Sequence, residues 1–317
     1  TAAAAAAPAA HLFFRPSPTR VARPKDAVEL LWLSRSSPPR CCGSGGRSSS
    51  SSVPVREREG CGGGGGLGVS SPDLVDREYA DLKLKEKLGH LGHVRIRQHV
   101  NPLSSALSVP VPVPDWKEVF RDPTLPLMVD VGSGSGRFLI WLAKNSPEPK
   151  NYLGLEIRQK LVKRAQFWVQ DLSLRNIYFL FANATVSFDQ LVTAYPGPLV
   201  LVSILCPDPH FKKKHHKRRV VQKPIVDSIS KNLSPGGQVF LQSDVLEVAL
   251  DMRNQFDALS DLFEHVCGLD THVTCDADGW FLNNPMRIRT EREIHAEFEG
   301  ARIYRRIYRK RDPSPVS

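Results

Sequence analysis

Residues 125 to 145 read LPLMVDVGSGSGRFLIWLAKN, and this stretch is the strongest indication of the fold class. It opens with an apolar run that contains one acid, Asp130, and turns through Gly132, Gly134 and Gly136. It then continues into RFLIWLAKN, whose apolar residues recur at helical spacing. The three glycines predict a tight turn where the backbone can approach a ligand, followed by a helix whose first N–H groups are free to bind it. A strand, a glycine turn and a helix together form the first unit of a sheet that binds ligands beyond its strand ends.

The same alternation of short apolar runs and amphipathic stretches continues along the chain. Nearly continuous Val, Ile and Leu runs separated by helices predict an α/β fold with a Rossmann-like, mostly parallel central sheet and helices on both faces. The late stretches FEHVC and ARIYRRIYRKR predict further strands, including an antiparallel one at the sheet edge. The predicted parallel strands are LPLMVDVG (125–132), NYLGLEI (151–157), NIYFLFANA (176–184), PLVLVSIL (198–205) and GGQVFLQSD (236–244).

Residues 1–68 differ in composition from the rest of the chain. They run from an alanine tract through RSSSSSVPVRERE to GCGGGGGLG and hold too few large apolar residues to form a core. We therefore predict a disordered low-complexity tail over 1–68 and one folded domain over 73–313. The tail is rich in Arg and Ser and poor in acids, as transit peptides are, and its Ala and Ser content favours the chloroplast. A mitochondrial location, or a cytoplasmic and nuclear one, is the alternative.

Charge and cysteine content exclude several classes of protein. The net charge is +10, but the tail holds nine basic and four acidic residues, so the remainder, with 34 basic and 29 acidic residues, is only mildly basic. Nucleic-acid binding must therefore be argued from clustering of charge. Six cysteines without a C-x-x-C pair predict neither a metal site nor a disulfide framework. No apolar run approaches the roughly 20 residues that span a bilayer, so we expect no membrane partner.

Polar groups at the predicted strand ends indicate the ligand. A nicotinamide or flavin site requires a third glycine at position 137, where this chain has Arg137. An acid just before the glycines, Asp130, is instead typical of S-adenosylmethionine-dependent methyltransferases. Glu156 lies at the spacing from which a carboxylate can hold both ribose hydroxyls. Asn183 ends the third strand, where it could meet an adenine edge or simply cap the strand.

The stretch PDPHFKKKHHKRR, residues 207–219, makes a more specific resemblance possible. Together with VDVGSGSG, GLEI, FANA, GGQVFLQSD, a late TERE and the preamble RIRQHVNPL, it resembles the TrmB-type tRNA (guanine-N(7)-)-methyltransferase family. The resemblance covers the chain from about Arg95 to Arg309. It implies a class I S-adenosylmethionine-dependent methyltransferase and, with the predicted transit peptide, a plant organellar form. The chain departs from the family pattern at Asp130, where many members have Glu, at Cys206, which replaces an aromatic residue, and at Arg292, which replaces Phe or Tyr.

The resemblance also implies roles for individual residues. Asp208 is the implied active-site residue. The residues expected around S-adenosylmethionine, including the glycine turn, are Asp130, Gly132, Gly134, Gly136, Glu156, Ile157, Asn183, Ala184 and Leu205. The residues expected to face the tRNA guanosine are Lys212, Asp244, Thr290, Glu291, Arg292 and Glu293.

The chemistry of the expected reaction makes demands that these residues can meet. Nitrogen 7 of guanine carries a lone pair and no proton, so its methylation needs alignment rather than a general base. We expect Asp208 to accept hydrogen bonds from the guanine N1–H and amino groups and to counter the charge that develops on the ring. Contact with the amino group of the cofactor is the alternative role. Asp244 either helps Asp208 to hold the base or caps the helix that begins near Leu246.

The basic residues around this strand end are expected to bind the tRNA backbone. A solvated surface or an import signal is the alternative for such a run. The expected backbone contacts are Lys213, Lys214, Lys217, Arg218 and Arg219, with Arg95 and Arg97 as a second group. We expect the enzyme to act without a scaffold partner, as a monomer or homodimer. A methyltransferase for another RNA and a non-catalytic RNA-binding subunit are the competing functions.

Overall fold

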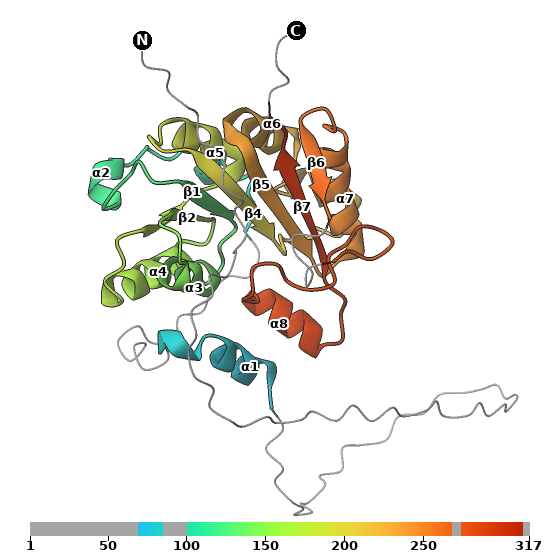
Figure 1. Ribbon diagram of the computed structural model, residues 1–317, viewed down its shortest axis with the longest axis horizontal. Helices are drawn as coiled ribbons and strands as arrows, with labels where there is room; N and C mark the ends of the chain where they lie inside the picture. Colours follow the sequence, from blue (N-terminus) through green and yellow to red (C-terminus); the bar gives the residue numbers. More distant parts are fainter. Residues whose placement is uncertain (1–68, 85–99, 268–273, 313–317) are drawn as a thin grey trace, which may run out of the picture. The chain divides into compact units, whose positions relative to one another are not determined.

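The computed structural model describes residues 69–84, 100–267 and 274–312 (Figure 1). The described residues belong to one unit of the chain. The predicted tail over 1–68 and the predicted tRNA contacts Arg95 and Arg97 lie outside them. In the described part, no helix has the length and apolar character needed to cross a membrane.

A seven-stranded sheet forms the centre of the fold, with the strand order β3-β2-β1-β4-β5-β7-β6. The strands β1 to β5 pair in parallel, and β7 is antiparallel to both β5 and β6. The predicted mostly parallel α/β sheet with a late antiparallel strand is therefore confirmed. The strands are β1 (Leu127–Val131), β2 (Asn151–Glu156), β3 (Ile177–Phe181), β4 (Leu199–Leu205), β5 (Leu233–Ser243), β6 (Phe263–Val266) and β7 (Tyr304–Lys310).

The late strands form an antiparallel pair at the end of the sheet, as predicted, because the edge strand β6 pairs antiparallel with β7. The antiparallel strand β7 does not form the edge of the sheet, because it is inserted between β5 and β6. Its residues Arg305, Arg306, Ile307 and Tyr308 are all buried, as expected of a strand with a neighbour on each side. The edge is formed by β6, the earlier of the two strands in the sequence.

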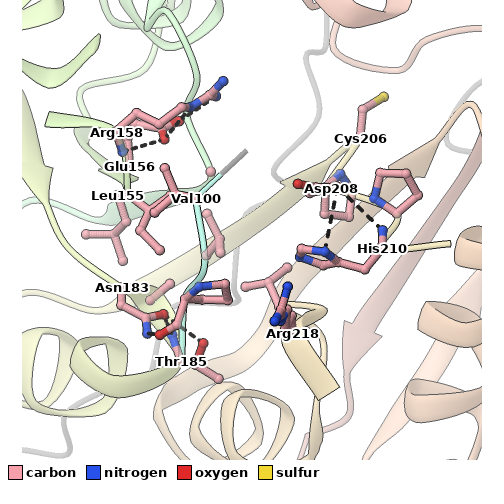
Figure 2. Close-up of a pocket in the computed structure, with 18 of the residues that line it drawn as sticks. Val100, Leu155, Glu156, Arg158, Asn183, Thr185, Cys206, Asp208, His210 and Arg218 are labelled. Carbon is pink, nitrogen blue, oxygen red and sulfur yellow. Dashed lines mark hydrogen bonds and ion pairs between the residues drawn. The ribbon is translucent and has the colours of Figure 1, made fainter. Parts of the chain in front are cut away.

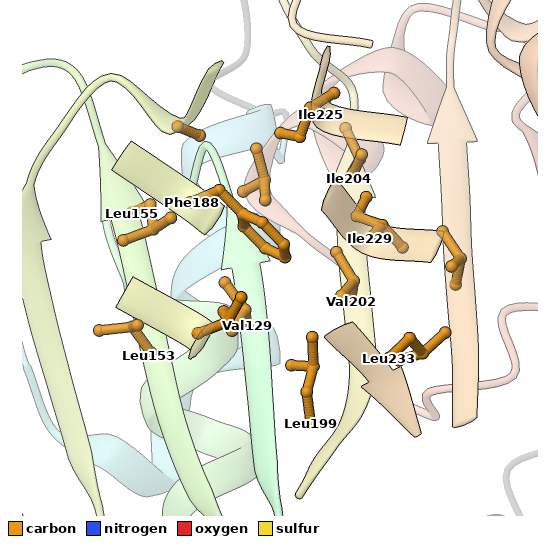
Figure 3. Packing of buried hydrophobic residues seen from close by; sticks show 14 of the residues in the cluster. Val129, Leu153, Leu155, Phe188, Leu199, Val202, Ile204, Ile225, Ile229 and Leu233 are labelled. Carbon is orange, nitrogen blue, oxygen red and sulfur yellow. The ribbon is translucent and has the colours of Figure 1, made fainter. Parts of the chain in front are cut away.

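Helices cover both faces of the sheet, as predicted. The core splits into two clusters because successive side chains of a strand point to opposite faces. On one face α5 and α6 pack over β1, β2 and β4, and Figure 3 shows Phe188, Ile225 and Ile229 against Val129 and Val202. On the other face α3 and α4 pack together with α1 and α8. The helices are α1 (Ser71–Glu78), α2 (Trp116–Val119), α3 (Arg137–Asn145), α4 (Gln159–Asp171), α5 (Ala184–Thr193), α6 (Lys223–Asn232), α7 (Leu246–Asp257) and α8 (Glu291–Phe298), with short 3₁₀ helices η1 (Ala80–Leu82), η2 (Ser105–Leu107) and η3 (Lys213–Arg218).

The strand order places a crevice at the centre of the sheet. From β1 the chain proceeds to β2 and β3 in one direction, and it then crosses to β4 and β5 in the other. The connections that follow β1 and β4 therefore diverge, which opens a space beyond the carboxyl ends of these two strands. Ligands bind at this switch point in open α/β sheets.

Candidate active site

A cavity of about 480 Å³ lies beyond the carboxyl ends of β1, β2, β4 and β5 (Figure 2). Its volume lies in the range typical of sites for small molecules and cofactors. The predicted residues that line it are Gly132, Glu156, Ile157, Asn183, Ala184, Asp208, Arg218, Asp244 and Arg292. Lining residues that the sequence did not single out include Val131, Leu155, Arg158, Thr185, His210 and Phe211. The fold thus gathers residues from positions 100 to 292 around one cavity.

The glycine turn forms one wall through its backbone. Gly132, Gly134 and Gly136 have φ values of +85°, +57° and +86°, which other residues adopt only with strain. At Gly136 a Cβ atom would also lie 2.8 Å from the Cβ of Ala165 and from the ring of Phe179. Gly132 lines the cavity, whereas Gly134 and Gly136 lie outside its lining and shape the turn that leads into α3.

Glu156 ends β2 with a buried carboxylate that already has partners. Its Oε2 accepts hydrogen bonds from the backbone N–H of Gly134 at 2.8 Å and from Nη2 of Arg158 at 3.1 Å. Its Oε1 accepts from the backbone N–H and from Nε of Arg158, both at 2.9 Å. Figure 2 shows Arg158 beside Glu156 at the cavity. A ribose hydroxyl that bonded to Glu156 would therefore compete with Arg158 for the same oxygens.

Asp130 is not among the residues that line the cavity, although the next two residues, Val131 and Gly132, are. Its side chain is buried, and its Oδ1 accepts a hydrogen bond of 2.7 Å from the Ser203 hydroxyl on β4. Burial raises the pKa of Asp130 to about 7, while the bond from Ser203 opposes this shift and the charge of Glu156 adds to it. A positively charged group nearby would favour the ionised form of this carboxyl.

Asn183 lines the cavity and caps α5. Its Oδ1 accepts from the backbone N–H and from the hydroxyl of Thr185, at 3.2 and 2.9 Å. Its Nδ2 donates to the carbonyls of Pro102 and Leu107, both at 3.0 Å. Both hydrogens of the amide are thus used within the protein, so a bond to an adenine edge would replace one of these contacts. Leu205 is half-buried and is not among the lining residues.

The loop after β4 brings Asp208 to the cavity (Figure 2). The backbone N–H of Cys206 donates to the carbonyl of Gln242 at 2.7 Å, which fixes the start of the loop. Asp208 is about one third exposed, and its Oδ1 lies 3.4 Å from the backbone nitrogen of His210 and 4.0 Å from Nδ1 of that ring. Burial raises the pKa of the Cys206 thiol to about 12, so this side chain is uncharged at the base of the loop.

Asp244 and Arg292 face the cavity as an ion pair. Nη2 and Nε of Arg292 donate to Oδ2 of Asp244 at 2.6 and 3.1 Å. The N-cap residue of α7 is Val245, so the alternative role of Asp244 as a helix cap is not observed. Because Arg292 lines the cavity, the departure from the family pattern at this position alters the site directly.

The other residues of the TERE segment are not among the residues that line the cavity. Thr290 caps α8 by accepting from the backbone N–H of Glu293 at 3.1 Å. Glu291 pairs with Arg137 of α3. Glu293 is fully buried and accepts hydrogen bonds from Arg305 at 2.5 Å and from Gln242 at 3.0 Å. These three side chains brace α8 within the protein.

The basic run divides into exposed and buried members. The backbone of Lys212 to Arg218 forms the end of the loop and η3, and the side chains of Lys212, Lys213, Lys214 and Lys217 are exposed. Phe211 is 68% exposed and lines the cavity beside them. Arg219 is only 6% exposed and forms ion pairs with Glu247 and Asp251, contrary to the prediction that it contacts the tRNA backbone. Within the described ranges, no three His, Cys, Asp or Glu side chains are grouped to hold a metal.

Comparison with other proteins shows which sequences and structures this chain is similar to. Residues 124–306 match a family model described as "Putative methyltransferase". A tRNA (guanine-N(7)-)-methyltransferase of Synechococcus sp. (strain JA-2-3B'a(2-13)) is 45% identical over 227 residues, which are 72% of this chain and 87% of that protein. The tRNA (guanine-N(7)-)-methyltransferase of Synechococcus elongatus (strain ATCC 33912 / PCC 7942 / FACHB-805) is 43% identical over 219 residues, which are 69% of this chain and 97% of that protein. Among solved structures, an rRNA methylase from Streptococcus thermophilus has a TM-score of 0.39 at 13% identity, over 62% of this chain and 91% of that chain.

Proposed function

The chain belongs to the tRNA (guanine-N(7)-)-methyltransferase family, and we infer that it transfers the methyl group of S-adenosylmethionine to nitrogen 7 of a guanosine in tRNA. The observation that carries the inference is the meeting of Glu156, Asp208 and Asp244 in one cavity at the switch point of the sheet. A carboxylate at the second strand suits a ribose, and two carboxylates on the opposite side suit the donor groups of guanine.

The cavity wall around β1 and β2 fits the cofactor. S-adenosylmethionine supplies, when bound, a methyl group on a positively charged sulfur. We propose that Glu156 holds the ribose hydroxyls in place of Arg158, while Val131 and Leu155 offer apolar surface. Asn183 and Ala184 stand at the adenine end. The positive charge of the bound cofactor would favour the ionised form of Asp130, which precedes the glycine turn.

The residues after β4 and β5 are proposed to hold the target base. Nitrogen 7 has no proton to lose, so the protein must mainly orient the ring against the methyl group, and such alignment contributes on the order of 7–11 kcal/mol. Asp208 accepts hydrogen bonds from the N1–H and amino groups of guanine, and its charge stabilises the cationic ring that forms. Asp244 shares this task, with Arg292 holding its carboxylate in place.

The exposed lysines of η3 are proposed to bind tRNA phosphates beside the base pocket. We expect the triple variant Lys213→Ala, Lys214→Ala, Lys217→Ala to bind tRNA more weakly, because fewer counterions are released when fewer phosphates are neutralised. The salt dependence of log Kd should flatten by about one unit of slope for each phosphate that the variant no longer binds. The measurement is tRNA affinity as a function of salt concentration. Lys223→Ala, an exposed cation paired with Asp227 outside the run, is the control and should keep the slope; a triple variant that also keeps it would contradict the proposal.

We further propose that the target guanosine lies in the variable loop and that the chain acts without a scaffold partner. The test incubates the purified 317-residue chain with methyl-labelled S-adenosylmethionine and tRNA transcripts carrying G or A at the variable-loop site. We expect label only with G, recovered as 7-methylguanosine. Equal label on both transcripts would indicate a different target. Activity that required an added protein would contradict the partner proposal, and label on unrelated RNA alone would favour the competing RNA methyltransferase.

The location of the enzyme is proposed from the composition of residues 1–68. Their Arg and Ser content with few acids supports a chloroplast transit peptide and hence a plant organellar form. The similarity to cyanobacterial proteins is what an enzyme of chloroplast ancestry would show.

A further inference from the structure

The segment from Cys206 to Arg219 carries both the proposed base-holding carboxylate and the basic helix η3. Pro207 and Pro209 lack N–H groups, so the backbone on either side of Asp208 cannot donate hydrogen bonds to a neighbouring strand. Cys206 and His210 have φ values of +48° and +45°, which a residue with a side chain keeps only when its surroundings hold it there. The position of Asp208 therefore depends on contacts that fix the two ends of this segment.

Arg219 supplies such a contact at the far end of the segment. Its Nε donates to the carbonyl of Pro209, the residue after Asp208, at 3.0 Å. This bond closes a loop that contains η3. The start of the segment is held by the bond from Cys206 to Gln242, so Asp208 lies between two fixed points of the backbone.

The remaining donors of Arg219 fasten this loop to α7. Nη1 donates to Oδ2 of Asp251 at 3.0 Å, and Nη2 donates to Oε1 of Glu247 at 2.7 Å. Nη2 also lies 3.1 Å from Nε2 of His216 in η3. The planar guanidinium has donors directed along its edges, so one side chain can hold the loop, η3 and α7 together.

We propose that Arg219 is a positioning residue for the reaction, rather than the tRNA contact that its place in the basic run predicts. The lysines of η3 are proposed to bind the tRNA backbone, and Asp208 is proposed to hold the base. Arg219 joins both groups into one fixed unit. The inference rests on the proposed function. It also follows from exposure and charge, because a 6% exposed guanidinium paired with two carboxylates offers little to a phosphate.

The test compares Arg219→Gln and Arg219→Lys with the wild-type chain in steady-state methylation of tRNA. For Arg219→Gln we expect kcat to fall by about 100-fold, because small displacements of a catalytic group cost this much. The KM for tRNA, its salt slope and the Kd for S-adenosylmethionine should stay near wild type. Arg219→Lys should recover part of kcat, because its ammonium can still pair with Glu247 and Asp251. If Arg219 instead bound a phosphate, Arg219→Gln would raise KM and flatten the salt slope, as expected for the triple lysine variant, and that result would overturn the proposal.

A second variant loosens the same set of bonds from the side of α7. The double variant Glu247→Gln, Asp251→Asn leaves Arg219 in place and removes no cation, so a lower kcat could not come from weaker phosphate binding. We expect kcat to fall with the Kd for S-adenosylmethionine unchanged. This variant decides the matter if Arg219→Gln fails to fold, and an unchanged kcat would overturn the proposal. A wild-type chain that methylates no tRNA would overturn the proposed function and this inference together, whereas an active wild type with fully active variants would overturn this inference alone.

Discussion

Asp208→Ala is expected to lower kcat for tRNA methylation by roughly 10²- to 10³-fold, the usual cost of removing a group that stabilises charge in a transition state. In the structure Asp208 lines the cavity across from Glu156, and its side chain is about one third exposed. The proposed hydrogen bonds to guanine and the attraction to the cationic ring would both be removed. Single-turnover methylation with saturating S-adenosylmethionine measures the effect on the methyl-transfer step.

Two further measurements identify what Asp208 contacts. The Kd for S-adenosylmethionine should stay unchanged in Asp208→Ala, because the proposed partner is the base and not the cofactor. A large rise in this Kd would instead favour the alternative role, contact with the cofactor amino group. Asp208→Asn should be as impaired as the alanine variant, since a neutral amide leaves the ring charge uncompensated. The control is Asp227→Ala, an exposed carboxylate of α6 that pairs with Lys223.

Glu293→Ala is expected to lower the stability of the fold strongly, although the family resemblance places this residue at the substrate. Its carboxylate is fully buried with Arg305, and Asn284 donates to both oxygens at 3.0 and 2.9 Å. The substitution removes the buried partner of Arg305 and leaves it, among the described residues, paired with the partly exposed Glu297. Breaking a buried pair in this way costs about 3–5 kcal/mol of the free energy of unfolding. For a folded unit of this size the melting temperature should fall by about 10 °C, which calorimetry or circular dichroism of the full chain measures.

Glu299→Ala is the matched control for this prediction. Glu299 follows α8, its side chain is 63% exposed, and it lies 3.9 Å from Arg292. An exposed pair of this kind contributes less than about 1 kcal/mol, so the melting temperature should stay close to wild type. If Glu293→Ala kept the wild-type melting temperature and selectively raised the KM for tRNA, Glu293 would have the substrate-facing role that the resemblance implies.

Most of the fold could be predicted from the sequence because its signals are local. The apolar run before Gly132, the glycine spacing and the helical pattern after Arg137 each lie within a few residues of one another, and β1, the turn and α3 form as expected. The position of β7 between β5 and β6 could not be predicted in this way. Strand order there depends on which strand pairs with β5, and that choice involves partners as distant in the chain as Gln238 and Arg309.

The candidate site likewise has features that the sequence predicts and features that depend on tertiary packing. The grouping of acids could be inferred from the order of the residues. Acids that follow parallel strands lie together beyond the carboxyl ends of those strands. Glu156, Asp208 and Asp244 line one cavity there. Which charged side chains line the cavity became evident only from the packing of distant elements. In the sequence Arg219 is one more cation of a basic run and Glu293 belongs to a substrate motif. In the structure, Arg219 forms ion pairs with Glu247 and Asp251 of α7, and Glu293 forms one with Arg305 of β7. The exposure of a charged side chain depends on what packs against it, and those partners come from elements far away in the chain.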